Sequence, residues 1–177
     1  MSQSATLYRI SKDNFEKLKE SEPNSYFDIG SVKSYVTFPG SFMGLEFILS
    51  KGRDKSTIAL VNAIFNSRNI LGQEKYDSLP PEQKFEFYES GQLIPYINLE
   101  TISKLDKLLN TVTENEIHLN YNAKELNENG IYPGVWHNDN TKDKAYNERD
   151  IMEGVADLKT IIGQAAREND FILVFIG

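Results

Sequence analysis

The feature that most constrains the fold of this chain is an amphipathic pattern near its carboxyl end, followed at once by a short apolar run. Five apolar residues recur there at steps of four and three positions, and therefore share one face of a helix: Ile151, Val155, Leu158, Ile162 and Ala165. We expect this helix to span about residues 143–168. The run at residues 171–176 is too short for a typical helix and rich in aromatic and β-branched residues, which predicts a fully buried central strand.

Shorter patterns upstream predict further helices and strands. We expect strands at residues 6–10 and 92–97, an edge strand at 85–88, helices at 42–49 and 57–66, and a loop at 67–72. Residues suited to cap helices are Ser11, Asn98, Thr113 and Asn122, and Pro23 is expected to end the first helix. The sequence therefore predicts an α+β fold over residues 1–177, a single compact domain with a small sheet, a buried C-terminal strand and several packed helices.

Two residue types carry more specific expectations. Gly154 and Gly163 interrupt the long helix at a cost of about 1 kcal/mol each relative to alanine, so one of them should lie where another element packs closely. Several aromatic residues fall in segments predicted as loops, where they would suit an interface with a protein or a small ligand. They are Tyr26, Phe27, Tyr35, Phe38, Tyr76, Tyr88 and Tyr96.

Composition narrows the class of protein. The 177 residues are 40% hydrophobic and 25% charged, which matches one ordinary globular domain. The absence of cysteine excludes disulfide frameworks, thiolate metal sites and cysteine hydrolases. No secretory signal is visible and the longest apolar stretches are too short to span a bilayer, so we expect a cytoplasmic protein. The net charge of −7 disfavours nucleic acid and anionic membranes as partners.

One segment gathers residues suited to chemistry. Residues 131–139 hold the single tryptophan, Trp136, together with Tyr132, His137 and Asp139 around a Pro-Gly turn. His137 is a candidate general base oriented by Asp139, and the two are also competent metal ligands. The alternative interpretation is structural, with Tyr132 and Trp136 anchoring a turn to the core. A metal site normally needs three or four ligands, so we expect no metal here.

Two further titratable residues lie on predicted helices. Glu46 stands among apolar neighbours, and such a carboxyl can have a raised pKa and act as an acid, a base or a binding group. His118 lies between Ile117 and Leu119, where a hydrogen-bonded structural role is the commoner case. The sequence lacks the glycine-rich motifs of nucleotide sites and the G-x-S-x-G of serine hydrolases, so we expect no cofactor.

Two stretches carry a family resemblance. Residues 119–126 and 130–136, followed by a long helix and a closing apolar strand, resemble the YfbM-like family, bacterial proteins grouped as a domain of unknown function. Residues 42–49 are similar to an early helix of that family, but Glu46 stands where its members usually carry histidine. The resemblance implies a compact α+β fold and a bacterial cytoplasmic setting, and brings no established activity. If that histidine were catalytic in the family, the exchange would put the activity in doubt here.

Two functions from different classes fit these observations. The first is a non-enzymatic interaction module whose acidic surface and aromatic residues engage a partner protein, with an immunity or antitoxin-like role against a basic partner as a special case. The second is a small-molecule-binding protein or hydrolase with a pocket near residues 132–139, where His137 and Asp139 supply the polar groups. A pocket with both side chains converging on it would favour the second.

Overall fold

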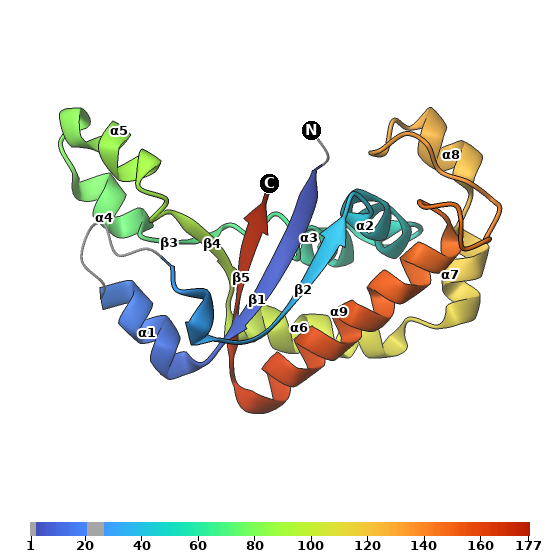
Figure 1. Ribbon diagram of the computed structural model, residues 1–177. Helices are drawn as coiled ribbons and strands as arrows, with labels where there is room; N and C mark the ends of the chain where they lie inside the picture. The colour runs from blue at the N-terminus through green and yellow to red at the C-terminus, as the bar shows by residue number, and fades with distance from the viewer. Residues whose placement is uncertain (1–2, 21–26) are drawn as a thin grey trace.

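A computed structural model describes residues 3–20 and 27–177, and in this part of the chain five strands form one antiparallel sheet (Figure 1). The order across the sheet is β2-β1-β5-β4-β3. The strands are β1 (Ser4–Ile10), β2 (Val32–Pro39), β3 (Asn69–Leu71), β4 (Ile94–Ile97) and β5 (Phe171–Ile176). The carboxy-terminal strand β5 is therefore central, as the apolar run predicts, and pairs with β1 and β4 on its two sides.

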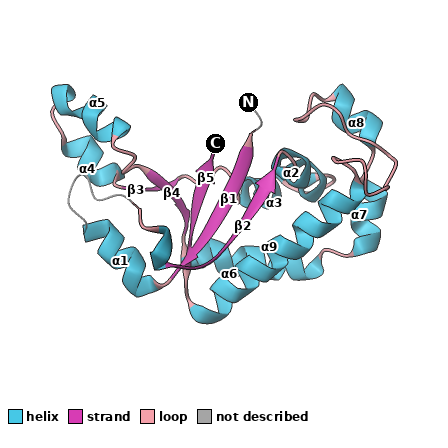
Figure 2. Cartoon of the chain, in the orientation of Figure 1, coloured by secondary structure: helices cyan, strands magenta, loops and turns pink. Residues whose placement is uncertain are grey.

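Helices cover both faces of this sheet. They are α1 (Lys12–Glu20), α2 (Phe42–Ser50), α3 (Lys55–Asn62), α4 (Gln73–Ser78), α5 (Pro81–Glu89), α6 (Leu99–Thr111), α7 (Glu114–Asn120), α8 (Ala123–Glu128) and α9 (Glu148–Glu168), with a 3₁₀ turn at Ile29–Ser31. Figure 2 shows α1, α4 and α5 on one side of the sheet and the remaining helices on the other. Within the described residues, no helix has both the length and the apolar character needed to cross a membrane. The α+β prediction is confirmed.

The two faces of β5 belong to two separate hydrophobic clusters. Ile172 and Val174 point into a large core built with α2, α3, α6 and α9, whereas Leu173 joins a small cluster with Phe15 and Leu71. Successive residues of a strand point to opposite faces, so the unbroken apolar run serves both clusters. The prediction of full burial holds for residues 172–174, while the ring of Phe171 is only partly covered and Ile176 is half exposed at the end of the strand.

The long helix α9 packs its apolar stripe into the larger cluster through glycine contacts. A Cβ atom placed on Gly154 would lie 2.8 Å from Leu45 Cδ1, which confirms that one of the two helix glycines marks a close approach. A Cβ on Gly44 of α2 would lie 2.2 Å from the Trp136 ring. Both distances are shorter than non-bonded carbon atoms tolerate. The absence of a side chain at Gly44 therefore lets α2 approach Trp136, and its absence at Gly154 lets α9 approach α2.

The predicted caps are observed. The Asn98 side chain accepts a hydrogen bond from Thr101 N at 2.9 Å, and Thr113 and Asn122 cap the next two helices in the same manner. Ser11 Oγ accepts from Asn14 N at the start of α1. The expected end of α1 at Pro23 and the expected loop position of Tyr26 lie outside the described residues.

Several local predictions are wrong. The expected edge strand at residues 85–88 lies within helix α5, which begins with Pro81 at its first turn and buries Phe87 alone among its aromatic residues. Proline is favoured at that position because its missing N–H has no helical partner there. The expected loop at residues 67–72 contains β3, a three-residue strand whose pairing with β4 is distant in sequence.

One strand, the expected places of several aromatic residues and two helix boundaries also differ from the prediction. The sequence patterns do not predict strand β2, which holds Tyr35 and Phe38. Tyr76, Tyr88 and Tyr96, which are expected in loops, also lie in helices or strands. Of the aromatic residues expected in loops, Phe27 does lie in one. Helix α9 begins at Glu148 rather than near residue 143, because Asn147 caps it by accepting from Asp150 N. Helix α3 ends at Asn62, four residues before the predicted limit.

Candidate functional site

Trp136 anchors the segment that was predicted to carry chemistry. Its side chain is 3% exposed, its indole Nε1 donates to Ile131 O at 2.9 Å, and its backbone exchanges two hydrogen bonds with the Asn127 side chain. The turn before it contains a cis Tyr132–Pro133 peptide and a Gly134 with φ +75°. The structural interpretation of Trp136 is therefore confirmed, since it fixes the turn to the core.

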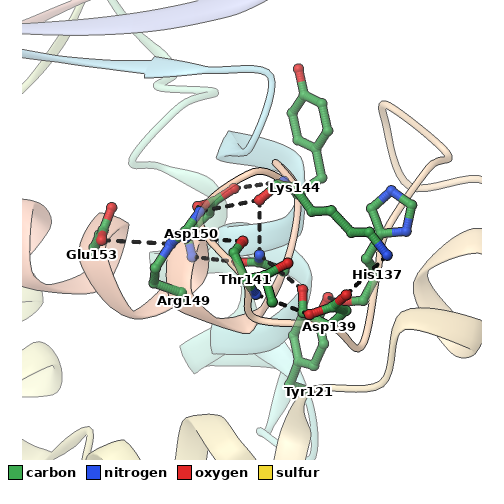
Figure 3. Close-up of polar contacts among 10 residues, drawn as sticks. Tyr121, His137, Asp139, Thr141, Lys144, Arg149, Asp150 and Glu153 are labelled. Carbon is green, nitrogen blue, oxygen red and sulfur yellow. Dashed lines mark hydrogen bonds and ion pairs between the residues drawn. The ribbon is translucent and has the colours of Figure 1, made fainter.

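His137 and Asp139 follow on an exposed loop that packs against the start of α9 (Figure 3). The Asp139 carboxylate accepts from Lys144 Nζ at 2.9 Å and from Thr141 N at 3.0 Å, and these bonds lower its pKa. The His137 ring points away from that carboxylate, and the contacts of His137 are made by its backbone, which donates to Tyr146 O and accepts from Tyr121 Oη. The structure does not bring the two side chains together as a catalytic pair.

The same loop is tied down by the first turn of α9. Arg149 donates to the carbonyl oxygens of Thr141 and Lys144, and the Asp150 carboxylate accepts from Tyr146 N at 2.6 Å. Burial, with the charges of Glu148 and Asp150 adding to it, raises the pKa of Tyr121 above its ordinary range. Tyr121 is therefore a neutral hydrogen-bond donor. The contacts of Arg149 and Asp150 connect the loop to α9, which is a structural role.

His118 takes the structural role that its position predicts. Its Nδ1 lies 2.8 Å from Glu148 Oε1, and Glu148, nearly buried, also accepts from the Asn140 amide. In residues 3–20 and 27–177, no three His, Asp or Glu side chains converge in the way that a metal ion requires.

Glu46 lies in a different setting from the loop residues. It lines a cavity of about 470 Å³ between α2, α3 and the end of β5, a size typical of small-ligand sites. The cavity walls are mostly apolar, with a few polar groups among them. The lining residues are Gln3, Phe42, Met43, Glu46, Phe47, Ser50, Ile58, Asn62, Asn66, Ile131 and Ile176.

The Glu46 carboxyl is held by two asparagines of the neighbouring helix segment. Asn66 Nδ2 donates to Glu46 Oε2 at 3.3 Å, and the Asn62 amide, with its nitrogen turned toward the carboxyl, donates to Oε1 at 3.0 Å. Desolvation by the apolar walls raises the pKa of Glu46, and the bond from Asn66 opposes that rise. Glu46 is therefore a half-buried carboxyl with a raised pKa, and each of its two oxygens accepts one amide hydrogen bond.

Ser50 adds a second polar group to this cavity. It follows Glu46 by four residues, so both side chains share one face of α2. The Ser50 hydroxyl is buried and has no hydrogen-bond partner among the described residues. A buried hydroxyl without a hydrogen-bond partner costs free energy of folding.

The predicted site residues thus lie in three places. Glu46 lines the cavity, and Tyr132 lies beside it, because Gln3, which also lines the cavity, donates its N–H to Tyr132 Oη at 3.1 Å. Trp136 is in the core, and His137 and Asp139 are on the outer loop. Sequence reasoning missed Ser50, Asn62 and Asn66. The four-residue spacings of 46 and 50, and of 62 and 66, were the available signal.

The fold and site define an α+β domain with an antiparallel sheet and a helix-lined cavity that holds a half-buried carboxyl. Over residues 1–175 the chain matches the family described as a domain of unknown function, DUF1877, and it belongs to that family. It is similar to the crystal structure of a protein of unknown function, YfbM from Escherichia coli, with a TM-score of 0.63 and 16% identity over 100% of both chains. This likeness shows a shared fold and confirms the resemblance to the YfbM-like family. No curated protein sequence matches the chain.

Proposed function

We propose that this protein binds a small molecule in the Glu46 cavity, and that the molecule has an apolar body and a cationic amine. The observation that carries the proposal is a carboxyl with a raised pKa, facing a mostly apolar cavity beside a buried and unpartnered hydroxyl. Ligand pockets of this kind combine apolar walls with a few polar groups that fix orientation.

The amine follows from the chemistry of the polar groups. Desolvation disfavours the charged form of Glu46, and an ammonium group at hydrogen-bond distance would compensate that charge where the asparagine amides do so only in part. The apolar body follows from the walls, where Phe42, Met43 and Phe47 present carbon surface to the cavity. A rotation of the buried Ser50 hydroxyl toward the cavity that Ser50 lines would supply a donor and an acceptor for a second polar atom of the ligand.

The proposal is tested by titrating the protein with hexylamine, hexanoate and 1-hexanol, using calorimetry and amide NMR shifts. We expect hexylamine to bind tightest and to shift amides of α2 and α3. Charge-assisted hydrogen bonds contribute about 1.5–3 kcal/mol, so Glu46→Gln should weaken hexylamine binding by about tenfold or more. The affinity should also rise as pH rises through the pKa of Glu46, because only the carboxylate attracts the amine.

A matched control keeps this test specific. Glu153 is an exposed glutamate on α9, outside the cavity lining, and Glu153→Gln should leave hexylamine affinity unchanged. The proposal is wrong if hexanoate binds as tightly as hexylamine, or if both glutamate variants bind hexylamine as the parent protein does.

A second candidate is the non-enzymatic interaction module, with the immunity or antitoxin-like role as its special case. It is favoured by one observation: Phe85 and Tyr88, three residues apart on α5, are 74% and 61% exposed on a chain of net charge −7. A basic protein partner would suit this surface. In a pull-down from bacterial lysate, one stoichiometric basic protein should co-purify with the parent chain and be lost from the Phe85→Ser, Tyr88→Ser variant. Retention by that variant would count against the surface.

A further inference from the structure

A second cavity, of about 480 Å³, lies on the face of the sheet opposite the Glu46 cavity. Phe175 of β5 lines it, while the next residue, Ile176, lines the Glu46 cavity. Since successive strand residues point to opposite faces, the two cavities are separated by the central strand. The other described walls come from α1, β3, α4, β4, the end of α5 with the turn after it, and Phe27. Figure 1 shows α1, α4 and α5 together on the left of the sheet, away from α2 and α9.

The floor of this cavity is built of aromatic rings that hold one another in place. Phe15 stacks on Phe171 with centroids 3.9 Å apart, and Tyr96 lies 4.9 Å from Phe15. Phe27 stacks on Phe175 at 5.5 Å. Rings fixed by ring contacts keep their orientation without a ligand, and their faces and edges suit a flat apolar molecule. Phe15, Phe27, Tyr96 and Phe175 line the cavity directly.

Gln92 is a polar residue in the lining of this cavity. Its Nε2 atom is buried and has no hydrogen-bond partner among the described residues. Its backbone passes close to Gly72: a Cβ on that residue, which has φ +82°, would lie 2.6 Å from Gln92 O. A buried amide donor with no acceptor costs free energy, and a rotation of the Gln92 side chain toward the cavity would let a ligand oxygen accept from it and recover that cost.

The charges at the mouth select the form of that oxygen. Among the described residues that line the cavity, Lys19, Lys75 and Glu74 are exposed, so two cations and one carboxylate lie in this part of the lining. A carboxylate is the acceptor that uses both the Gln92 amide and these lysines. We propose that the cavity binds a planar aromatic carboxylate, with its ring on the Phe15, Tyr96 and Phe175 side chains and its carboxylate accepting from Gln92 Nε2.

The test uses three indole probes that share one ring and differ in the polar group: indole-3-acetate, indole-3-acetamide and tryptamine. Calorimetry and saturation-transfer NMR on the full chain should show indole-3-acetate binding tightest, the acetamide next, and tryptamine at least tenfold weaker than the acetate. Gln92→Leu should lower the affinity for indole-3-acetate by about tenfold, the loss typical of one hydrogen bond to a charged group. Ile70→Trp should abolish binding, because Ile70 lines the cavity and the larger side chain would fill it.

Controls separate this site from the Glu46 cavity. Glu46→Gln should leave indole-3-acetate affinity unchanged, and Gln92→Leu should leave hexylamine affinity unchanged, since the cavities lie on opposite faces. Thermal melting establishes that each variant is folded. The inference is overturned if indole-3-acetate fails to bind at millimolar concentration, if tryptamine binds as tightly, or if folded Gln92→Leu and Ile70→Trp bind it as the parent does.

Discussion

The two sides of the central strand offer cavities of similar size but opposite polar chemistry. On the side of α2 and α3, the Glu46 carboxyl provides an acceptor among aliphatic and aromatic walls. On the side of α1 and α4, the Gln92 amide provides a donor above an aromatic floor. Residues 175 and 176 of β5 each reach one of them. The comparison shows that one buried strand separates two cavities, and under our two proposals a single polar side chain would set the ligand preference of each.

The sides also differ in how they are supported. The Glu46 cavity lies over the large core, where Leu45, Ile48 and Val155 are fully or almost fully buried. The aromatic cavity lies over a small cluster whose buried members include Phe15, Leu71 and Leu173. Burial is the main source of stability, so we expect the first side to carry most of the free energy of unfolding.

The largest expected effect tests that difference directly. Leu45→Ala removes a side chain that is 0% exposed and touches Gly154, and should lower the free energy of unfolding by about 4 kcal/mol. Leu71→Ala makes the same chemical change at a residue that already lines a cavity, and should cost about 2 kcal/mol because fewer contacts are lost. Urea unfolding at one temperature measures both. Equal losses would mean that the two sides support the fold alike.

A smaller effect of opposite sign is expected at the two unpartnered polar groups. Ser50→Ala removes the buried hydroxyl of the first cavity, and Gln92→Leu removes the buried amide of the second. An unsatisfied buried group costs about 1–3 kcal/mol, so each variant should be more stable than the parent by about 1 kcal/mol while losing affinity for its proposed ligand.

Thermal melting at matched concentrations, with and without the probe for each cavity, measures this trade. Ser56→Ala is a suitable control, because that exposed hydroxyl is hydrogen-bonded to Asp54, and its loss should not stabilise the protein. If both cavity variants were destabilised, the two groups would have partners in solution, and the argument that they await ligands would fail.

The sequence predicts the elements whose signals are local. The stripe of α9 and the run of β5 are periodic over many residues, and Asn98 and Asn122 act on N–H groups three residues away. The sequence does not predict the elements that depend on long-range pairing. Strand β3 is three residues long and is stabilised by its pairing with β4. A different cause applies to helix α5, where the exposed Phe85 and Tyr88 fall in a short aromatic stretch that is also typical of a strand.

The candidate site was predicted only in part, for the same reason. Glu46 stands out in sequence because its neighbours are apolar. The asparagines that hold it come from the segment around α3, and two other lining residues, Gln3 and Ile176, are more than 40 positions away in sequence. The short sequence separation of His137 and Asp139 predicts a catalytic pair. In the structure the Asp139 carboxylate instead accepts hydrogen bonds from Lys144 and from a backbone N–H of the loop. Proximity along a loop does not determine which way side chains point.

The smallest effect concerns the pH dependence of stability at Glu46. Burial raises the pKa of Glu46 above its ordinary value of 4.5, so the folded state binds this proton more tightly than the unfolded state does. Between pH 4.5 and the raised pKa, the unfolded state loses the proton first, and stability falls as pH rises through that window. The effect is small because the side chain is only half-buried and partly screened by solvent.

Glu46→Gln removes this titration and sharpens the comparison between the cavities. The variant should match the parent in stability below pH 4.5 and exceed it at pH 7, where the parent keeps a partly desolvated charge. Guanidinium unfolding at pH 4 and pH 7 measures both differences, and Glu153→Gln, at an exposed site, should show the same difference from the parent at both. The opposite result would be a parent protein whose free energy of unfolding rises relative to that of Glu46→Gln as pH rises. It would mean that the protein already compensates the charge of the Glu46 carboxylate. A ligand amine would then have no charge to neutralise, and the aromatic cavity would be the stronger candidate site.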